Sequence, residues 1–268
     1  MGGLFQREAW KSIMATLKSQ QYKALLLDLD GTTIPMAGEL PSERVIKCVK
    51  EVIKKGIHVV IATGRIRQSA SPAIEALGIT DPCIFYNGAQ LYHIGEQRIL
   101  QQHVIETHEA VELLKIFKGK LIELSSASGK IEFIEPPKDL EKLEIFGCYV
   151  PRLTKKEADG YMLKLSAFPH LKAIMATKTW DGLPVVGVTN VNATKQEAIS
   201  HVINYFKIDP KEMVAVGDGE NDMPMVIAAG MGVAMENAAE SLKKVANYIA
   251  PSVEEDGVAH VIEKFFLK

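Results

Sequence analysis

The sequence predicts an α/β fold in which a parallel sheet is interrupted by an inserted α+β domain. Apolar, strand-length runs alternate with helical patterns near both ends of the chain, and this alternation is typical of parallel strands. Between these parts the strands become shorter, and polar residues alternate with apolar ones. The 268 residues, 47% of them hydrophobic, suffice for a core with an insertion. We expect a discontinuous domain over 1–88 and 189–268 and a second domain over 89–188.

The first predicted strand starts at Lys23 and ends in two carboxylates, Asp28 and Asp30, which Gly31 follows. Its apolar residues run without polar alternation, which indicates a strand buried on both faces. Ligands of open α/β sheets bind just beyond the carboxyl ends of the strands. Two carboxylates at that place repel each other unless a cation or a shared proton compensates. Taken alone, the motif is also compatible with a solvated acidic turn.

After the first strand, two helix–strand units are expected before residue 88. An amphipathic helix over 4–19 should precede the first strand. Ser42 is the expected N-cap of the helix after the first strand, and Gly56 should end that helix. We expect the strands to be parallel, with right-handed crossovers. The elements in order are a helix to Lys55, a strand over 57–62, a helix over 68–77 and a strand over 83–86 that stops at Asn87-Gly88.

The middle of the chain is expected to form a mainly antiparallel sheet, with shorter, more alternating strands within 91–99 and 120–135. Ser128-Gly129 lies between two alternating runs, and this pattern predicts a hairpin over 121–125 and 130–134. The other predicted elements are strands over 171–177 and 183–189, joined through Trp180-Asp181-Gly182, and helices over 106–117, 137–146 and 154–167.

The parallel pattern returns after the insertion. Thr194 is the expected cap of a helix that runs to about Phe206 and has Lys195 in its first turn. The next strand covers 213–216 and ends in the turn Gly217-Asp218-Gly219-Glu220-Asn221-Asp222. The remaining elements are a helix over 223–229, a strand over 231–234, a helix over 238–246, a strand over 248–250 and a helix over 257–267.

Three predicted strands therefore end in turns that carry polar or charged side chains. These turns contain Asp28 with Asp30, Thr63 with Gly64, and Asp218 with Asp222. If the strands are parallel neighbours, the three turns and Lys195 meet at one edge of the sheet. Carboxylates without sulfur or imidazole ligands suit a hard ion such as Mg²⁺. Helix N-termini and glycine turns supply N–H donors for phosphate, so the simplest ligand is a phosphoryl group bridged to Mg²⁺.

The composition argues against several other partners. The formal net charge is −2, which provides no electrostatic footprint for nucleic acid or an anionic membrane. No run approaches the roughly 18 apolar residues that a membrane span needs. The start of the chain lacks the pattern of a signal peptide. The three cysteines, Cys48, Cys83 and Cys148, are scattered and odd in number, so we expect a reducing compartment and a cytoplasmic protein.

The stretches DLDGTT, ATGR, a lone lysine and GDGEND stand in this order and resemble the four motifs of the haloacid dehalogenase (HAD) superfamily of phosphohydrolases. The resemblance covers the chain from about residue 22 onward. Val214 to Pro224, together with the position of the insertion, resembles the Cof-type branch with its type IIB cap. Thr33 departs from the family pattern, in which leucine is commoner at this position. The resemblance implies a Rossmann-like core with an inserted cap domain.

The resemblance also implies a catalytic role for each matched carboxylate. Asp28 would be the nucleophile and would form an aspartyl-phosphate. Asp30 would be the general acid and base for the leaving group and for water. Mg²⁺ would be held by Asp28, the backbone carbonyl of Asp30 and Asp218, and would offset the repulsion between nucleophile and phosphate.

Further residues would bind the phosphate by the same resemblance. Thr63, with the N–H of Gly64, would bind phosphate oxygens, and Lys195 would neutralise charge on the transferring phosphoryl group. Asn221 could donate a hydrogen bond to phosphate, and Asp222 could orient Lys195 or a metal-bound water. Thr63 and Asp222 could instead be ordinary helix caps.

The leading hypothesis is a Mg²⁺-dependent phosphatase that hydrolyses a small phosphorylated metabolite, such as a sugar phosphate or a similar phosphomonoester. A phosphotransferase or phosphomutase would use the same aspartyl-phosphate, with a second hydroxyl as the acceptor. A non-catalytic phosphate-binding module is a third alternative, against which the intact Asp30 argues. The sequence leaves sugar phosphates, nucleotides, pyridoxal phosphate and flavin phosphates open as substrates, with polar residues of the inserted sheet such as Glu123, Ser125 or Glu132 as candidates for specificity.

Overall fold

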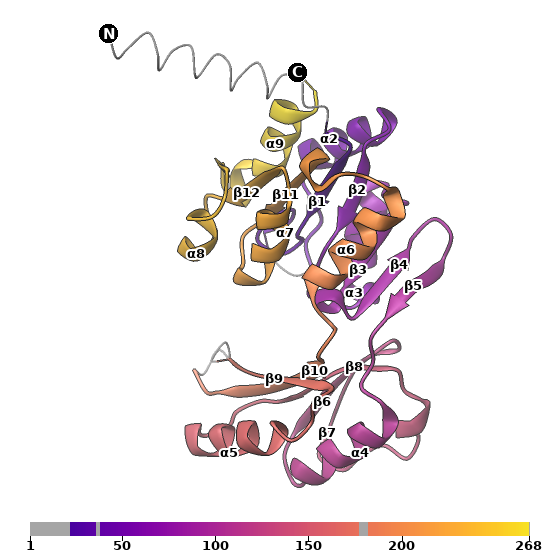
Figure 1. The fold of residues 1–268 in the computed structure, drawn as a ribbon, viewed down its shortest axis with the longest axis vertical. Coiled ribbons are helices and arrows are strands. Elements are labelled where there is room, and N and C mark those ends of the chain that lie inside the picture. The colour runs from indigo at the N-terminus through magenta and orange to yellow at the C-terminus, as the bar shows by residue number, and fades with distance from the viewer. Residues whose placement is uncertain (1–21, 36–37, 177–181, 268) are drawn as a thin grey trace. The chain divides into compact units, whose positions relative to one another are not determined.

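The computed structural model describes residues 22–35, 38–176 and 182–267, and the described chain forms two compact units (Figure 1). Of the described residues, the first unit contains 22–35, 38–60, 76–79 and 203–267, and the second contains 61–75, 80–176 and 182–202. The helix predicted over 4–19 lies outside the described residues, as do Trp180 and Asp181 of one predicted connection. The domain boundaries at 88/89 and 188/189 stay a prediction.

The first unit is built on a five-stranded sheet with the strand order β13-β12-β11-β1-β2. Strand β11 pairs with β1 on one side and β12 on the other, and β12 pairs with β13, all in parallel. Most of these strand residues are fully buried apolar side chains, which is why their sequences read as unbroken apolar runs. The bounds are β1 Ala24–Leu27, β2 His58–Ile61, β11 Met213–Gly217, β12 Met231–Met235 and β13 Tyr248–Ala250.

Helices flank this sheet, and their ends follow the predicted local signals. The hydroxyl oxygen of Ser42 accepts a hydrogen bond from the Val45 backbone at 3.2 Å, and Gly56 follows the helix with a φ of +80°. The bounds are α2 Glu43–Lys54, α7 Met223–Ala228, α8 Glu240–Lys243 and α9 Gly257–Phe265, while α3 Arg67–Leu77 and α6 Lys195–Phe206 each contribute residues to both units. None of the described helices is both long and apolar enough to cross a membrane.

The second unit contains an antiparallel five-stranded sheet with the order β7-β6-β8-β10-β9. The predicted hairpin is confirmed, because β6 and β7 pair from Ile122–Phe133 to Ser126–Gly129. Helices α4 and α5 lie on one face of the sheet and cover an apolar core (Figure 1). The bounds are β6 Ile122–Ser126, β7 Gly129–Phe133, β8 Ile145–Val150, β9 Leu171–Ala176, β10 Val185–Asn190, α4 Thr107–Ile116 and α5 Lys155–Leu165.

The helix predicted over 137–146 is wrong. The structure has only a short 3₁₀ turn, Leu140–Lys142, and then strand β8, which lies between β6 and β10. Pro136 and Pro137 stand just before and at the start of the predicted range. The strand that follows is rich in β-branched, aromatic and other apolar residues that pack between two partners. Pairing on both sides therefore overrides the helical pattern of the segment before it.

The strand near residue 84 keeps the expected parallel orientation to the strand before it, but it is not a member of the five-stranded sheet. Strand β3, Pro82–Phe85, pairs antiparallel with β4, Gln90–His93, in a separate three-stranded sheet that β5, Arg98–Gln102, completes. One isolated parallel bridge joins Ala62 to Ile84. The chain reverses direction between β3 and β4 because three successive residues are left-handed. These are Tyr86, Asn87 and Gly88, with φ of 54°, 53° and 108°.

Candidate active site

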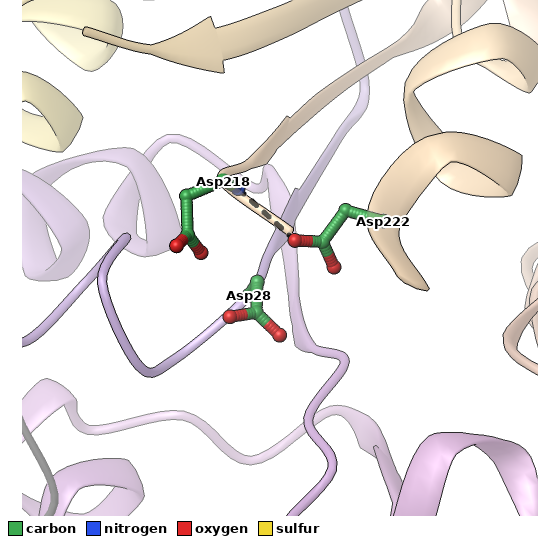
Figure 2. Close-up of side chains that lie close together, drawn as sticks. All are labelled: Asp28, Asp218 and Asp222. Carbon is green, nitrogen blue, oxygen red and sulfur yellow. Dashed lines mark hydrogen bonds between the residues drawn. The ribbon is translucent and has the colours of Figure 1, made fainter. Parts of the chain in front are cut away.

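Three carboxylates converge in the first unit, at the carboxyl ends of β1 and β11. Asp28 directly follows β1, and Asp218 directly follows β11, which is the parallel neighbour of β1. The Asp28 backbone N–H donates to the Val216 carbonyl at 3.0 Å, so the strand pairing extends to this residue. One carboxylate oxygen from each of Asp28, Asp218 and Asp222 lies within 4.8 Å of the others (Figure 2). The structure thus brings Asp28 and Asp218 together, as the argument from strand ends predicted.

Asp222 shapes the loop that carries Asp218. Its side chain is fully buried, and its Oδ2 accepts hydrogen bonds from the backbone N–H groups of Asp218 at 3.0 Å and Gly219 at 2.9 Å (Figure 2). It makes no side-chain cap to α7. A Cβ on Gly217 would lie 2.4 Å from the Asp222 Cβ, so only glycine leaves room for this arrangement.

The loop that follows β1, the strand next to β11, contacts the Asp218 side chain. The Thr32 hydroxyl donates to Asp218 Oδ1 at 2.9 Å. Gly31 has a φ of +76°, and a Cβ there would lie 2.5 Å from Asp218 Oδ2. The Asn237 side-chain amide donates to the Gly31 carbonyl at 2.8 Å. These contacts restrict both the loop and the carboxylate, which pre-organises the oxygen atoms for a ligand.

The other residues of the loop take different positions. The buried Thr33 hydroxyl donates to the Asp28 carbonyl at 2.6 Å, which gives this departure from the family pattern a structural role. Asp30 is half-buried, forms an isolated bridge with Ile34 and adds no carboxylate to the group of three. Asn221 is exposed, and its Oδ1 would lie 2.4 Å from a Cβ on Gly219, so its side chain folds back over the loop.

A second group of predicted residues gathers in the second unit. Thr63 is buried, and its backbone N–H donates to the Ile84 carbonyl at 2.9 Å. The Thr63 hydroxyl accepts a hydrogen bond from the Arg65 backbone N–H at 3.1 Å, which closes a local turn before α3, whereas the alternative from the sequence was a helix cap. A Cβ on the exposed Gly64 would lie 3.3 Å from the side-chain amide of Asn87.

The turn that contains Asn87 and Gly88 lies next to the start of α6. A Cβ on Gly88 would lie 2.1 Å from the Thr194 carbonyl oxygen and 2.9 Å from the Lys195 nitrogen, so backbone packs on backbone there. Thr194 caps α6 by accepting from the Glu197 N–H at 3.2 Å. Lys195 is only 3% exposed at the positive end of this helix. A buried ammonium group requires anionic or polar partners, which suits a residue that binds anions.

Sequence reasoning assigned no role to several of these residues. Thr32 stands inside the recognised motif, so its proximity to Asp218 could have been suspected. Asn237 is in a turn far along the chain, and the Asn87-Gly88 pair was read only as the end of a strand. No local pattern signals either contact, because both depend on segments that come together only in the folded chain.

The comparison with known proteins agrees with this geometry. A model of the haloacid dehalogenase-like hydrolase family matches residues 25–165 and 130–262. The Bacillus subtilis protein YkrA is 29% identical, over 91% of this chain and 98% of its own. The B. subtilis 5-amino-6-(5-phospho-D-ribitylamino)uracil phosphatase YcsE is 27% identical, over 91% and 96% respectively.

Solved structures give the same fold. A Bacteroides thetaiotaomicron protein described among phosphatases of the haloalkanoate (HAD) superfamily has a TM-score of 0.77 and 27% identity, with 93% of this chain and 97% of that chain covered. A HAD subclass IIB sugar phosphatase has a TM-score of 0.70 and 24% identity, with 92% and 100% covered, and supports the fold alone. The predicted fold class and the predicted class of enzyme, a HAD-type phosphatase, are thereby confirmed. The chain belongs to the haloacid dehalogenase-like hydrolases.

Proposed function

We propose that this enzyme is a Mg²⁺-dependent phosphatase that hydrolyses a small phosphomonoester through an aspartyl-phosphate on Asp28. The observation that carries the proposal is the convergence of the Asp28, Asp218 and Asp222 carboxylates within 4.8 Å in a chain of this hydrolase family. The side chain of Asp28 is almost buried at the end of a rigid strand, where a nucleophile can be held in line with a bound phosphate.

In the first step a carboxylate oxygen of Asp28 attacks phosphorus and forms a P–O bond. The bond from phosphorus to the leaving oxygen breaks, and Asp30 donates its proton to that oxygen, so the alcohol leaves neutral. Asp30 follows Asp28 by two residues and is only half-buried, which leaves its carboxyl group accessible to a substrate.

In the second step Asp30, now a carboxylate, takes a proton from a water molecule whose oxygen attacks phosphorus. The P–O bond to Asp28 breaks, which releases inorganic phosphate and restores both carboxyl groups to their starting protonation. The sum is the hydrolysis of one phosphomonoester by one water.

The donor set suits Mg²⁺. Three clustered carboxylates repel each other unless a cation is shared, and oxygen-only ligands suit a hard divalent ion. Asp28, the Asp30 carbonyl and Asp218 would hold the ion. Asp222 would support the site through the two backbone N–H groups that it already accepts from. When bound, the ion supplies charge neutralisation between the nucleophile and the phosphate.

The phosphate oxygens are assigned to Thr63, the Gly64 N–H, Lys195 and Asn221. The burial of Lys195 at a helix start and the contact between Gly64 and Asn87 support the first three assignments. Lys195 would neutralise the charge that develops on the phosphoryl group during transfer.

The experiment that tests the function is phosphate release from a panel that includes the phosphate ester named for the relative YcsE, glycerol 3-phosphate and an aryl phosphate. Release should require Mg²⁺, stop with a chelator and fall by at least about 10⁴-fold in Asp28→Asn, since the covalent route needs the carboxylate. Release that survives this substitution would overturn the covalent mechanism. Phosphoryl transfer to an added alcohol in place of water would favour a transferase.

We also infer a cytoplasmic location from the thiols. All three cysteines are free and buried, and burial raises the pKa values of Cys83 and Cys148 to about 12. Free thiols are typical of a reducing compartment. Cell fractionation checks the inference, and recovery of the protein in an oxidising compartment would contradict it.

A further inference from the structure

The antiparallel sheet of the second unit has one face that α4 and α5 do not cover. Its core face carries Leu124, Cys148 and Val188 against these helices. The register places Glu123, Tyr149, Gly187 and Ile174 in one row on the other face, on β6, β8, β10 and β9. Ile174 is 43% exposed and Tyr149 is partly exposed, so this face offers apolar surface beside charged and polar residues.

Two glycines leave the space that the Tyr149 ring occupies on the sheet. A Cβ on Gly187 would lie 2.7 Å from one edge of this ring, and a Cβ on Gly147 would lie 2.8 Å from the other edge. The ring therefore lies against the backbone of its own strand and of its neighbour. A residue with a side chain at either position would push the ring away from the sheet.

One side of the Tyr149 ring packs within the protein. The Tyr86 ring is 6.4 Å from the Tyr149 ring in an edge arrangement, and Tyr149 packs against the apolar cluster that contains Tyr86 and Phe146. Burial raises the pKa values of both tyrosines, so both stay neutral donors at physiological pH. With one side of the ring packed in this way, the exposed part of the Tyr149 ring is what a ligand would contact.

This platform adjoins the residues assigned to phosphate. Tyr86 directly precedes Asn87, whose side chain lies against Gly64. The Gln68 side-chain amide, from the segment that follows Gly64, donates to the Ala127 carbonyl in the β6–β7 turn. All these residues belong to the same compact unit.

We propose that Tyr149 is a specificity-determining residue, and that its ring is the floor of a subsite for phosphomonoesters whose leaving group contains a ring. The inference rests on the proposed function. A flat apolar floor formed by Tyr149 and Ile174 gains contact area from a planar heteroaromatic ring or from the C–H face of a cyclic sugar. A short acyclic leaving group gains little from it, while Glu123 beside Tyr149 is available to polar substituents of the ring.

The test compares kcat/KM for three esters, namely pyridoxal 5′-phosphate, glucose 6-phosphate and glycerol 3-phosphate. The wild type should prefer a ring ester, and which of the two it prefers separates a planar from a sugar ring. Tyr149→Ala should lower the ratio of ring to acyclic kcat/KM by about tenfold, chiefly through KM, because stacking is lost. Tyr149→Phe should keep the ratio within about threefold, since the ring remains.

Gly187→Ala is a second variant that leaves Tyr149 in place, and it should lower the ratio in the same direction by displacing the ring. Tyr161→Leu is the matched control, because Tyr161 packs on Phe117 at 5.0 Å in the helix-covered core. This control should leave the ratio at its wild-type value.

Preference of the wild type for glycerol 3-phosphate, or equal losses on ring and acyclic esters in Tyr149→Ala, would overturn the inference and leave the phosphatase function standing. If the wild type hydrolyses no ester at all, both the function and the subsite are overturned.

Discussion

The acidic cluster around Asp28 and the open face around Tyr149 are built in different ways. Asp218 and Asp222 are held by directional hydrogen bonds from backbone N–H groups and a hydroxyl, directly after buried strands. Tyr149 is held by register, two glycines and ring contacts on a sheet face. The difference teaches that the proposed chemistry depends on loop geometry that tolerates little change. In the proposed subsite, leaving-group selection depends on side chains that can be exchanged while the sheet stays intact.

Among variants that keep the Asp28 nucleophile, the largest effect is expected from Asp30→Asn, which tests the chemistry of the rigid region. The amide can neither donate the carboxyl proton nor activate water, so kcat should fall by about 10²–10⁴-fold. With an activated aryl phosphate the first step needs no proton, and a burst of about one phenol per protein should precede the block. Rapid-quench kinetics measure both. Glu240→Gln, at an exposed carboxylate, is the control, and an unchanged Asp30→Asn rate would exclude Asp30 as acid and base.

A smaller effect is expected from Asp222→Ala, which removes the acceptor for two backbone N–H groups. Leaving these buried donors unpaired should lower the free energy of unfolding by about 1–3 kcal/mol, and the half-saturating Mg²⁺ concentration should rise as the Asp218 loop loosens. Urea denaturation and Mg²⁺ titration of activity measure the two quantities. Asp222→Asn keeps an acceptor oxygen and should lose less stability. Equal stability of all three proteins would show that the loop does not depend on this acceptor.

The smallest effect is expected at the surface of the second unit, in Glu157. Its pKa is lowered to about 2, chiefly by the hydrogen bond from Lys120 and then by the Thr154 cap. Because the folded pKa lies below the ordinary value of 4.5, the stabilisation is present above pH 4.5 and is lost as the pH falls towards 2. Glu157→Gln should therefore lose less of its Tm than the wild type between pH 5 and 2.5. Parallel thermal curves across this range would contradict the prediction.

The sequence predicts those elements of the fold that depend on local signals. Strands β1 and β11 were predictable because their apolar runs and following acidic turns are local signals. The caps Ser42 and Thr194 were predictable for the same reason. Strand β8 was not, because its conformation depends on β6 and β10, which pair with it from distant parts of the chain.

The candidate site shows a similar limit. The argument from strand ends brought Asp28, Asp30, Asp218 and Asp222 to one edge of the sheet. That Asp30 lies outside the group of three carboxylates, and that Thr32 contacts Asp218, depends on rotamers and loop paths. The open face of the antiparallel sheet was suggested only through Glu123, Ser125 and Glu132. The role of Tyr149 emerges from Gly147 and Gly187, which have no side chain to mark them as part of a site.

The close approach of Gly88 to the Thr194 carbonyl has a consequence for protein engineering. The two ends of the segment 89–193 lie almost at one point, so only a short distance separates the place where the segment begins from the place where it ends. When the segment is exchanged between homologous enzymes, the distance between its ends is already set by two touching backbones, and the contacts to be matched are those of Ile66, Gln68 and Tyr86 with the segment. The segment can therefore be transplanted as a cassette, with Gly88 kept as the splice residue on one side and Thr194 on the other.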